Sequence, residues 1–154
     1  MSQNVWGAIT WLLFHSFAEK INEEQFSTIK DRFITFIKDT CLHLPCPICS
    51  SHAVEVLKQS NMKLINTKAD MIEFLRQFHN IVNIKLDKPI IDKNYVITYY
   101  KNVNLNAVIL QFIKAYSHKY GNYEIKAFQR ANERRLYLKG AISNINSILP
   151  CCRT

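Results

Sequence analysis

The chain has 154 residues, 48% apolar and 21% charged, which is typical of one globular domain and excludes a disordered chain. Its net charge of +8 would suit an anionic ligand, a nucleic acid or a membrane surface, but the lysines and arginines are spread along the chain. No apolar run reaches the roughly 18 residues of a membrane span, and the N-terminal segment does not resemble a signal peptide. We therefore expect a protein that is not secreted, with no membrane and no nucleic-acid partner.

Helical periodicity dominates the sequence, and only three glycines and four prolines interrupt it. A first helix is predicted by an apolar stripe at helical spacing, formed by Trp6, Ile9, Leu13 and Phe17. A second helix is predicted in the same way by Phe26, Ile29, Phe33 and Ile37.

The third and fourth helices are predicted from their end signals. Pro47 suits the first position of a helix, where its missing N–H costs nothing, and this helix should run to about Leu57. Thr67 or Asp70 should cap the fourth helix. The apolar face of the fourth helix is formed by Met71, Leu75, Phe78 and Val82. The segment "LDKPIID" should end it, because proline cannot continue the hydrogen-bond ladder.

The remaining sequence predicts a short fifth helix or turn over residues 93–101 and two amphipathic helices beyond it. The first of the two is indicated by Leu105, Val108, Ile109, Phe112, Ile113 and Tyr116, and the second by Leu138, Ala141, Ile142, Ile145 and Leu149. Gly121-Asn122 should separate them, and the tail "LPCCRT" is expected to be mobile.

The segment "HLPCPICSSH" contains a Cys-x-x-Cys pair, Cys46 and Cys49, that allows three chemistries. A zinc site would use both cysteines with His52 and either His43 or Cys41, but the chain has no second cysteine knuckle. A structural or inert pair is equally open. A redox role has a physical advantage, because the positive end of the predicted helix lowers a cysteine pKa and favours the thiolate.

A second motif, "FHNIVNIKLDKP", places three large polar side chains, His79, Asn80 and Asn83, beside an apolar stripe. Buried polar groups of this size need partners, and Lys85 and Lys88 follow as a pyrophosphate would require. An ordinary helix with one satisfied core histidine is the alternative. The chain has no G-x-G-x-x-G motif, so a flavin would have to be held by helices.

The blocks "WGAITWLLFH", "LPCPICSSH" and "FHNIVNIKLDKP", in this order, resemble the flavin-linked sulfhydryl oxidases of the Erv/ALR family. The similarity covers residues 3–101 and is strongest to the branch encoded by large cytoplasmic DNA viruses. It implies an all-α fold, a four-helix bundle with a short fifth helix that binds FAD at one end, usually as a homodimer. It divides the chain into an oxidase domain, residues 1–102, and a helical C-terminal extension, residues 103–154, ending in two cysteines.

The resemblance also implies an activity. Cys46 would exchange with the incoming thiol, Cys49 would lie against the isoalloxazine ring of FAD, and electrons would pass to dioxygen to give hydrogen peroxide. The residues expected to contact FAD are Gly7, Trp11, His15, Cys49, His52, His79, Asn80, Val82, Asn83, Lys85 and Lys88. Protein dithiols or a thioredoxin-like relay protein would be the partners, in the host cytoplasm or the virion. A zinc-stabilised helical interaction module is the alternative function.

The chain departs from the family pattern at several positions. Arg76 and Lys93 occupy the two positions of the family's structural disulfide, so packing must replace a bridge typically worth about 2–4 kcal/mol. Asp87 replaces a glycine. Cys41 is interpreted as a small buried apolar residue. The tail cysteines, Cys151 and Cys152, could form an electron shuttle or an intermolecular bridge, or have no role.

Overall fold

A computed structural model describes residues 3–117 and 125–153. Within these residues the chain forms seven α-helices joined by short 3-10 turns and loops, namely α1 (Gln3–Lys20), α2 (Phe26–Leu42), α3 (Pro47–Gln59), α4 (Lys68–Lys85), α5 (Lys93–Tyr99), α6 (Leu105–Ser117) and α7 (Ile125–Ile148). In this part of the chain the only β-type pairing is an isolated bridge between Ile21 and Cys152. The all-α prediction is confirmed.

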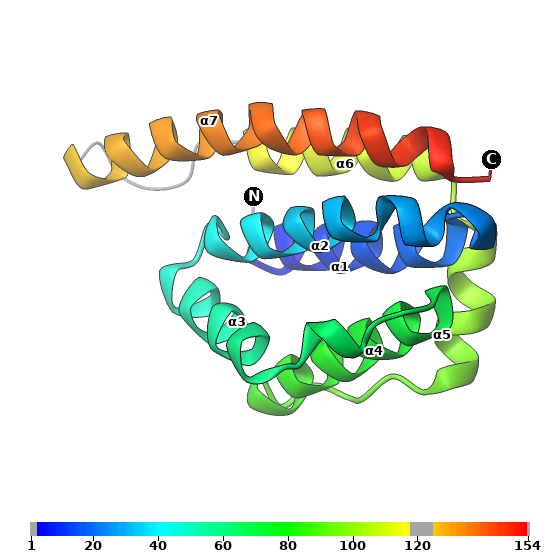
Figure 1. Cartoon of the computed structure of the whole chain (residues 1–154). Coiled ribbons are helices and arrows are strands. Elements are labelled where there is room, and N and C mark those ends of the chain that lie inside the picture. The colour runs from blue at the N-terminus through cyan, green and yellow to red at the C-terminus, as the bar shows by residue number, and fades with distance from the viewer. Residues whose placement is uncertain (1–2, 118–124, 154) are drawn as a thin grey trace.

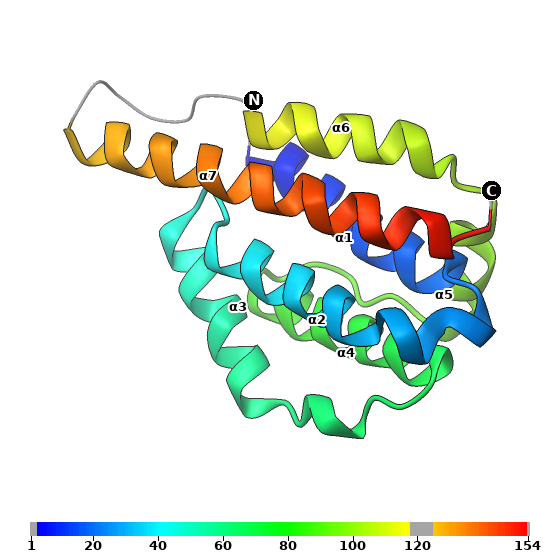
Figure 2. The ribbon, with the colours of Figure 1, turned by 45° about the horizontal axis from the view of Figure 1, so that its top comes forward.

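The helices form three layers. Helices α1 and α2 make the middle layer, α3 and α4 pack on one side of it, α6 and α7 pack on the other, and α5 crosses one end (Figures 1 and 2). Every residue from 13 to 20 is buried, so the second half of α1 is surrounded on all sides rather than along the single stripe its sequence suggested. The largest fully buried side chains include Phe14, Phe17, Phe33 and Phe36.

Helices α3, α4 and α5 begin where the sequence provides a cap. Cys46 is the N-cap of α3, with Pro47 in the first helical position. Thr67 caps α4 and forms a capping box with Asp70, in which each side chain accepts a hydrogen bond from the other residue's backbone N–H. Asp92 caps α5 by accepting a bond from the N–H of Tyr95 at 2.8 Å. These bonds satisfy N–H groups that the helices themselves leave unpaired.

Helix α4 ends in a Schellman motif centred on Asp87. The N–H of Lys88 donates to the carbonyl of Asn83 at 2.8 Å, and the N–H of Asp87 donates to that of Ile84 at 3.2 Å. This pairing requires a left-handed residue at position 87, and Asp87 has φ of 56°. The glycine expected there by family resemblance would adopt this conformation without strain.

The C-terminal helices are bonded to the middle layer by two tyrosine–threonine pairs. The hydroxyl groups of Thr10 on α1 and Tyr116 on α6 lie 2.7 Å apart, and Thr40 on α2 pairs in the same way with Tyr137 on α7. The side chains of Phe112 and Ile145 belong to the same hydrophobic core as α1 and α2. The core is therefore continuous across residue 102, the boundary that the resemblance implied.

The tail is docked, and the prediction that it is mobile was wrong. The N–H of Asn22 donates to the carbonyl of Cys151 and that of Arg153 to the carbonyl of Lys20, both at 2.8 Å. The guanidinium of Arg153 also pairs with the carboxylate of Glu19 at 3.1 Å. These bonds hold the tail against the end of α1. The predicted break at Gly121-Asn122 lies outside the described residues.

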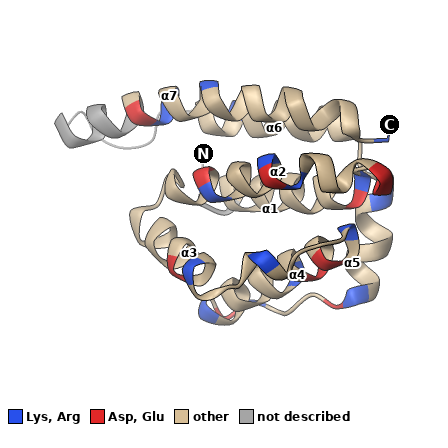
Figure 3. Ribbon diagram, in the orientation of Figure 1, with Lys and Arg blue, Asp and Glu red and all other residues tan. Residues whose placement is uncertain are grey.

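Charged residues are interspersed over the helices, with lysines and arginines among aspartates and glutamates (Figure 3). Among the described residues, no helix combines the length and apolarity needed to span a bilayer.

Candidate active site

Cys46 and Cys49 are joined in a disulfide at the N-terminus of α3, with their Cα atoms 5.2 Å apart. The N–H of Cys49 points at the sulfur of Cys46 at 3.2 Å. The hydroxyl of Ser50 donates to the carbonyl of Cys41 and so ties the first turn of α3 to the end of α2. After reduction, thiolates at this position would be stabilised by the backbone N–H groups and the positive end of the helix dipole.

A large cavity of about 560 Å³ opens beside the disulfide, between α1, α3, α4 and α5. Its size is within the usual range of small-molecule and cofactor sites. All but two of the residues expected to contact FAD line it, namely Gly7, Trp11, Cys49, His52, His79, Val82, Asn83, Lys85 and Lys88. Cys49 is thus exposed to this cavity, whereas Cys46 does not line it. The sequence motifs, far apart along the chain, converge on one space.

The cavity wall contains a stack of rings from α1 and α4. Trp11 and His79 lie nearly parallel, with centroids 4.1 Å apart and an interplanar angle of 7°. Behind them, His15 is 1% exposed and does not line the cavity, contrary to the expectation of a direct contact. His15 instead supports the stack, because its Nε2 and the Nδ1 of His79 are 2.9 Å apart and share one hydrogen bond.

Both histidines are neutral at physiological pH. Burial, with a smaller effect of His79, lowers the pKa of His15 to about 3, and burial with a smaller effect of Lys88 lowers the pKa of His79 to about 4. The ring of His15 also stacks on Tyr100 at 4.8 Å, while its buried Nδ1 has no hydrogen-bond partner among the residues that the structure describes. The pKa of His52 is lowered by burial and by Lys85. The wall next to Trp11 is therefore aromatic and uncharged.

Asn80, the second of the two expected FAD contacts that do not line the cavity, has another role. Its amide nitrogen donates to the carbonyl of Ile91 at 2.9 Å, and its amide oxygen accepts from the N–H of Ile91 at 2.8 Å. The guanidinium of Arg76, paired with Glu73 at 2.6 Å, also donates to the carbonyl of Ile91 at 3.3 Å. These bonds join α4 to the chain entering α5, close to where the family's structural disulfide would act. Packing is thus supplemented there by hydrogen bonds.

Sequence reasoning missed the aromatic contribution of α5 and the turn that follows it. Tyr95, Tyr99 and Tyr100 all line the cavity, and the rings of Tyr95 and Tyr99 stack at 5.1 Å. The segment "NYVITYY", with three tyrosines in seven residues, was the available signal.

The other cysteines are not bonded to one another. Cys41 is 2% exposed, and burial raises its pKa to about 12, which confirms the prediction of a small buried residue. Cys151 and Cys152 are free thiols beside Ile21, and burial, followed by Cys151, raises the pKa of Cys152 to about 12. They lie near the C-terminus, at the end of the molecule opposite α3 (Figure 1). This position does not support a shuttle that contacts Cys46 within the same chain.

The geometry does not favour the zinc alternative. Cys46 and Cys49 are bonded to each other, and the described residues contain no group of three or more histidines, cysteines or acids placed to hold a metal ion. His43 instead bonds through Nδ1 to the carbonyl of Asp39 at 2.7 Å.

Comparison with known proteins identifies the family. The model of the Erv1 / Alr family matches residues 8–102, which is more than half of the chain. The chain belongs to the Erv1/Alr family.

Individual relatives match between 54% and 67% of the chain. Protein 347L of Invertebrate iridescent virus 6 is 27% identical over 97 residues, covering 59% of this chain and 87% of that protein. An African swine fever virus protein named "FAD-linked sulfhydryl oxidase" is 29% identical over 103 residues, or 67% of this chain and 86% of that protein. The rice protein "FAD-linked sulfhydryl oxidase ERV1" is 31% identical over 84 residues, covering 54% of this chain and 43% of its own length. No solved structure matches significantly.

Proposed function

We propose that the chain is an FAD-linked sulfhydryl oxidase in which Cys46–Cys49 is the electron-accepting disulfide and the cavity beside Cys49 holds FAD. One observation carries the assignment. A disulfide at a helix N-terminus has one of its two cysteines, Cys49, on the wall of a cavity lined by aromatic rings and two lysines. Family membership and the names of the relatives support the same reaction class.

The residues present fit an FAD. Trp11 and His79 offer a flat, neutral surface on which an aromatic ring can stack. Lys85 and Lys88, on the cavity wall at the end of α4, would meet the phosphates. A Cβ atom added to Gly7, which lines the cavity, would meet no atom within 4 Å from the rest of the described chain beyond its own helix turn and neighbours, so the glycine leaves room there.

The chain's own residues carry out the thiol chemistry. A substrate thiolate attacks the sulfur of Cys46, the bond between the two cysteines breaks, and Cys49 leaves as a thiolate stabilised by the N-terminus of α3. A second substrate thiolate then attacks the substrate sulfur of the mixed disulfide and releases Cys46. The substrate dithiol has lost two electrons and two protons, and the cysteine pair has gained the two electrons. Bound FAD would supply the two-electron oxidant that restores the pair, with dioxygen as final acceptor and hydrogen peroxide as product.

The test is to purify the protein, dialyse it and measure both flavin absorbance and oxygen consumption with dithiothreitol. Cys46→Ser and Cys49→Ser should each abolish oxygen consumption, because either variant lacks the disulfide. Both should keep the flavin absorbance bands, because the cofactor would be bound mainly by residues of α1 and α4. Cys151→Ser, at the other end of the molecule, is the matched control and should retain turnover. A protein that takes up no FAD, or a Cys49→Ser variant that makes peroxide at the full rate, would overturn the proposal.

Finer points belong to the same proposal. The substrates would be protein dithiols or a thioredoxin-like relay protein, in the host cytoplasm or the virion. A homodimer, implied by resemblance, would need a surface other than the face of α1 and α2 that α6 and α7 cover (Figure 2). Light scattering of the purified protein measures its mass directly, and a monomer mass would refute the dimer.

A further inference from the structure

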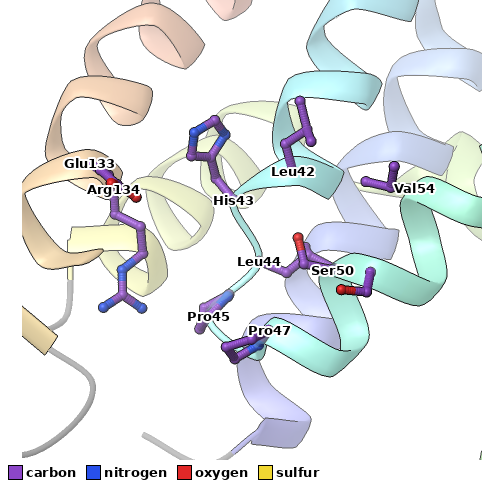
Figure 4. A pocket seen from close by; sticks show the side chains of 10 residues that line it. Leu42, His43, Leu44, Pro45, Pro47, Ser50, Val54, Glu133 and Arg134 are labelled. Atoms are coloured by element: carbon purple, nitrogen blue, oxygen red, sulfur yellow. The ribbon is translucent and has the colours of Figure 1, made fainter. Parts of the chain in front are cut away.

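A second hollow lies beside the loop that carries Cys46. This groove, which we call the α7 groove, has a volume of about 380 Å³ and lies between α7, the loop from α2 to α3, and the first turns of α3 (Figure 4). Both chain neighbours of Cys46, Pro45 and Pro47, line it, as do Ser50 and Ser51 on α3. The groove therefore borders the segment that carries the cysteine expected to exchange with substrate.

The loop that carries the disulfide borders both hollows. Cys49 lines the FAD cavity and Cys46 does not, while Leu44 lines both the cavity and the α7 groove. An attacking thiolate must approach Cys46 from the side opposite its leaving group, Cys49. Because the residues on both sides of Cys46 line the groove, a segment bound there would lie next to this residue.

Helix α7 forms the far wall of the groove with Glu133 and Arg134 (Figure 4). It is held in place by the stacking of Tyr137 on His43, with centroids 4.8 Å apart, and by the bond of Tyr137 to Thr40. This wall lies beyond residue 102, where the match to the family ends. The groove is thus a feature of this chain's C-terminal extension.

We infer that the α7 groove receives the extended, cysteine-bearing segment of a protein substrate, and that α7 makes the enzyme discriminate protein thiols from small thiols. The inference rests on the proposed function. The lining combines apolar side chains such as Leu44 and Val54 with two serines of α3 and the charged residues Glu133 and Arg134 of α7. A peptide suits this mixture, because its apolar side chains can cover the apolar part while its backbone and polar groups meet the polar part. A small thiol such as dithiothreitol covers neither surface and needs only access to Cys46.

The first test fills the groove. Ser51 is exposed on the groove wall, and Lys58 is exposed on the same helix but does not line the groove. Ser51→Trp should lower kcat/KM for reduced, unfolded ribonuclease A by about tenfold or more, mainly through KM, because the bulky ring occupies the peptide's place. Turnover of dithiothreitol, flavin absorbance and the unfolding midpoint should stay close to those of the parent, and Lys58→Trp should change none of them.

The second test changes the opposite wall. Glu133→Lys should lower kcat/KM for a lysine-flanked Cys-Gly-Gly-Cys peptide relative to a glutamate-flanked one, and Arg135→Glu, at an exposed position off the groove, should leave that ratio unchanged. The inference would be overturned if both groove variants, Ser51→Trp and Glu133→Lys, oxidised protein and peptide thiols with the kinetics of the parent while their oxidation of dithiothreitol was intact. If the parent fails to oxidise dithiothreitol, the proposed function itself fails.

Discussion

His15 is buried and His79 is partly buried, the two share one hydrogen bond, and this makes the stability of the protein dependent on pH. Folding lowers the pKa of both histidines, to about 3 and about 4, so in the range between these values and 6.5 the unfolded chain binds protons that the folded chain does not. Protonation of the two histidines therefore does not affect the free energy of unfolding above about pH 6.5, and it lowers this free energy as the pH falls below that value.

We expect the free energy of unfolding of the FAD-free protein to fall between about pH 7 and pH 5, at up to about 1.4 kcal/mol per pH unit for each histidine. Urea titrations across this range measure it. His79→Phe keeps a ring against Trp11 but cannot be protonated, so its slope should be shallower. Equal slopes for the parent and the variant would contradict the assignment of this pH dependence to His79.

At the scale of single elements, α4 brings His79, Asn83 and Lys88 to the cavity, and the way the helix ends sets the position of Lys88. The bond from the N–H of Lys88 to Asn83 folds the chain back over the last turn, and this is possible only because Asp87 is left-handed. A left-handed conformation costs an ordinary residue roughly 1–2 kcal/mol, less for aspartate, and glycine almost nothing.

Asp87→Gly should therefore raise the free energy of unfolding slightly, by roughly 0.5 kcal/mol, after allowing for the greater freedom of glycine in the unfolded chain. FAD binding should be unchanged, because the bond to Asn83 is kept. Urea unfolding gives the first quantity and flavin titration the second. Asp87→Ala is the matched comparison and should be less stable than Asp87→Gly; the reverse order would show that strain at this residue is not what limits the end of α4.

At the scale of the whole molecule, α7 separates the two groups of cysteines. Its residue Tyr137 stacks on His43, close to the redox pair, whereas Cys152 pairs with Ile21. Fifteen residues of mostly helical chain separate these two contacts, which places the tail roughly 20 Å from His43. A docked tail at that distance cannot reach Cys46.

A Cys151→Ser, Cys152→Ser double variant should consequently oxidise dithiothreitol and reduced ribonuclease A at the rates of the parent protein. Oxygen consumption with both substrates provides the measurement, and flavin absorbance confirms that the variant is intact. Slower oxidation of the protein substrate alone would show that the tail leaves its dock and relays electrons, as the shuttle hypothesis supposed.

Most of the helical organisation follows from local sequence. The apolar periodicity, Pro47 after Cys46 and the Thr67–Asp70 pair can each be recognised within a few residues of sequence. In the structure, the periodic segments form helices, and Pro47 and Thr67 mark the starts of α3 and α4. The convergence of Trp11, Cys49 and His79 also came from sequence, but only through the order of motifs that define a family. Periodicity alone cannot place three helices around one cavity.

Tertiary structure decided the rest. Whether His15 contacts the cavity or supports it from behind depends on which neighbour covers it, and that neighbour, Tyr100, is 85 positions away. The tail was predicted to be mobile because its docking partners, Glu19 and Lys20, are more than 130 residues earlier in the sequence. The α7 groove exists because α7 folds back beside the redox loop. Composition and periodicity report which residues prefer to be buried and in what local geometry, while the partner that buries them is set by the global packing of the chain.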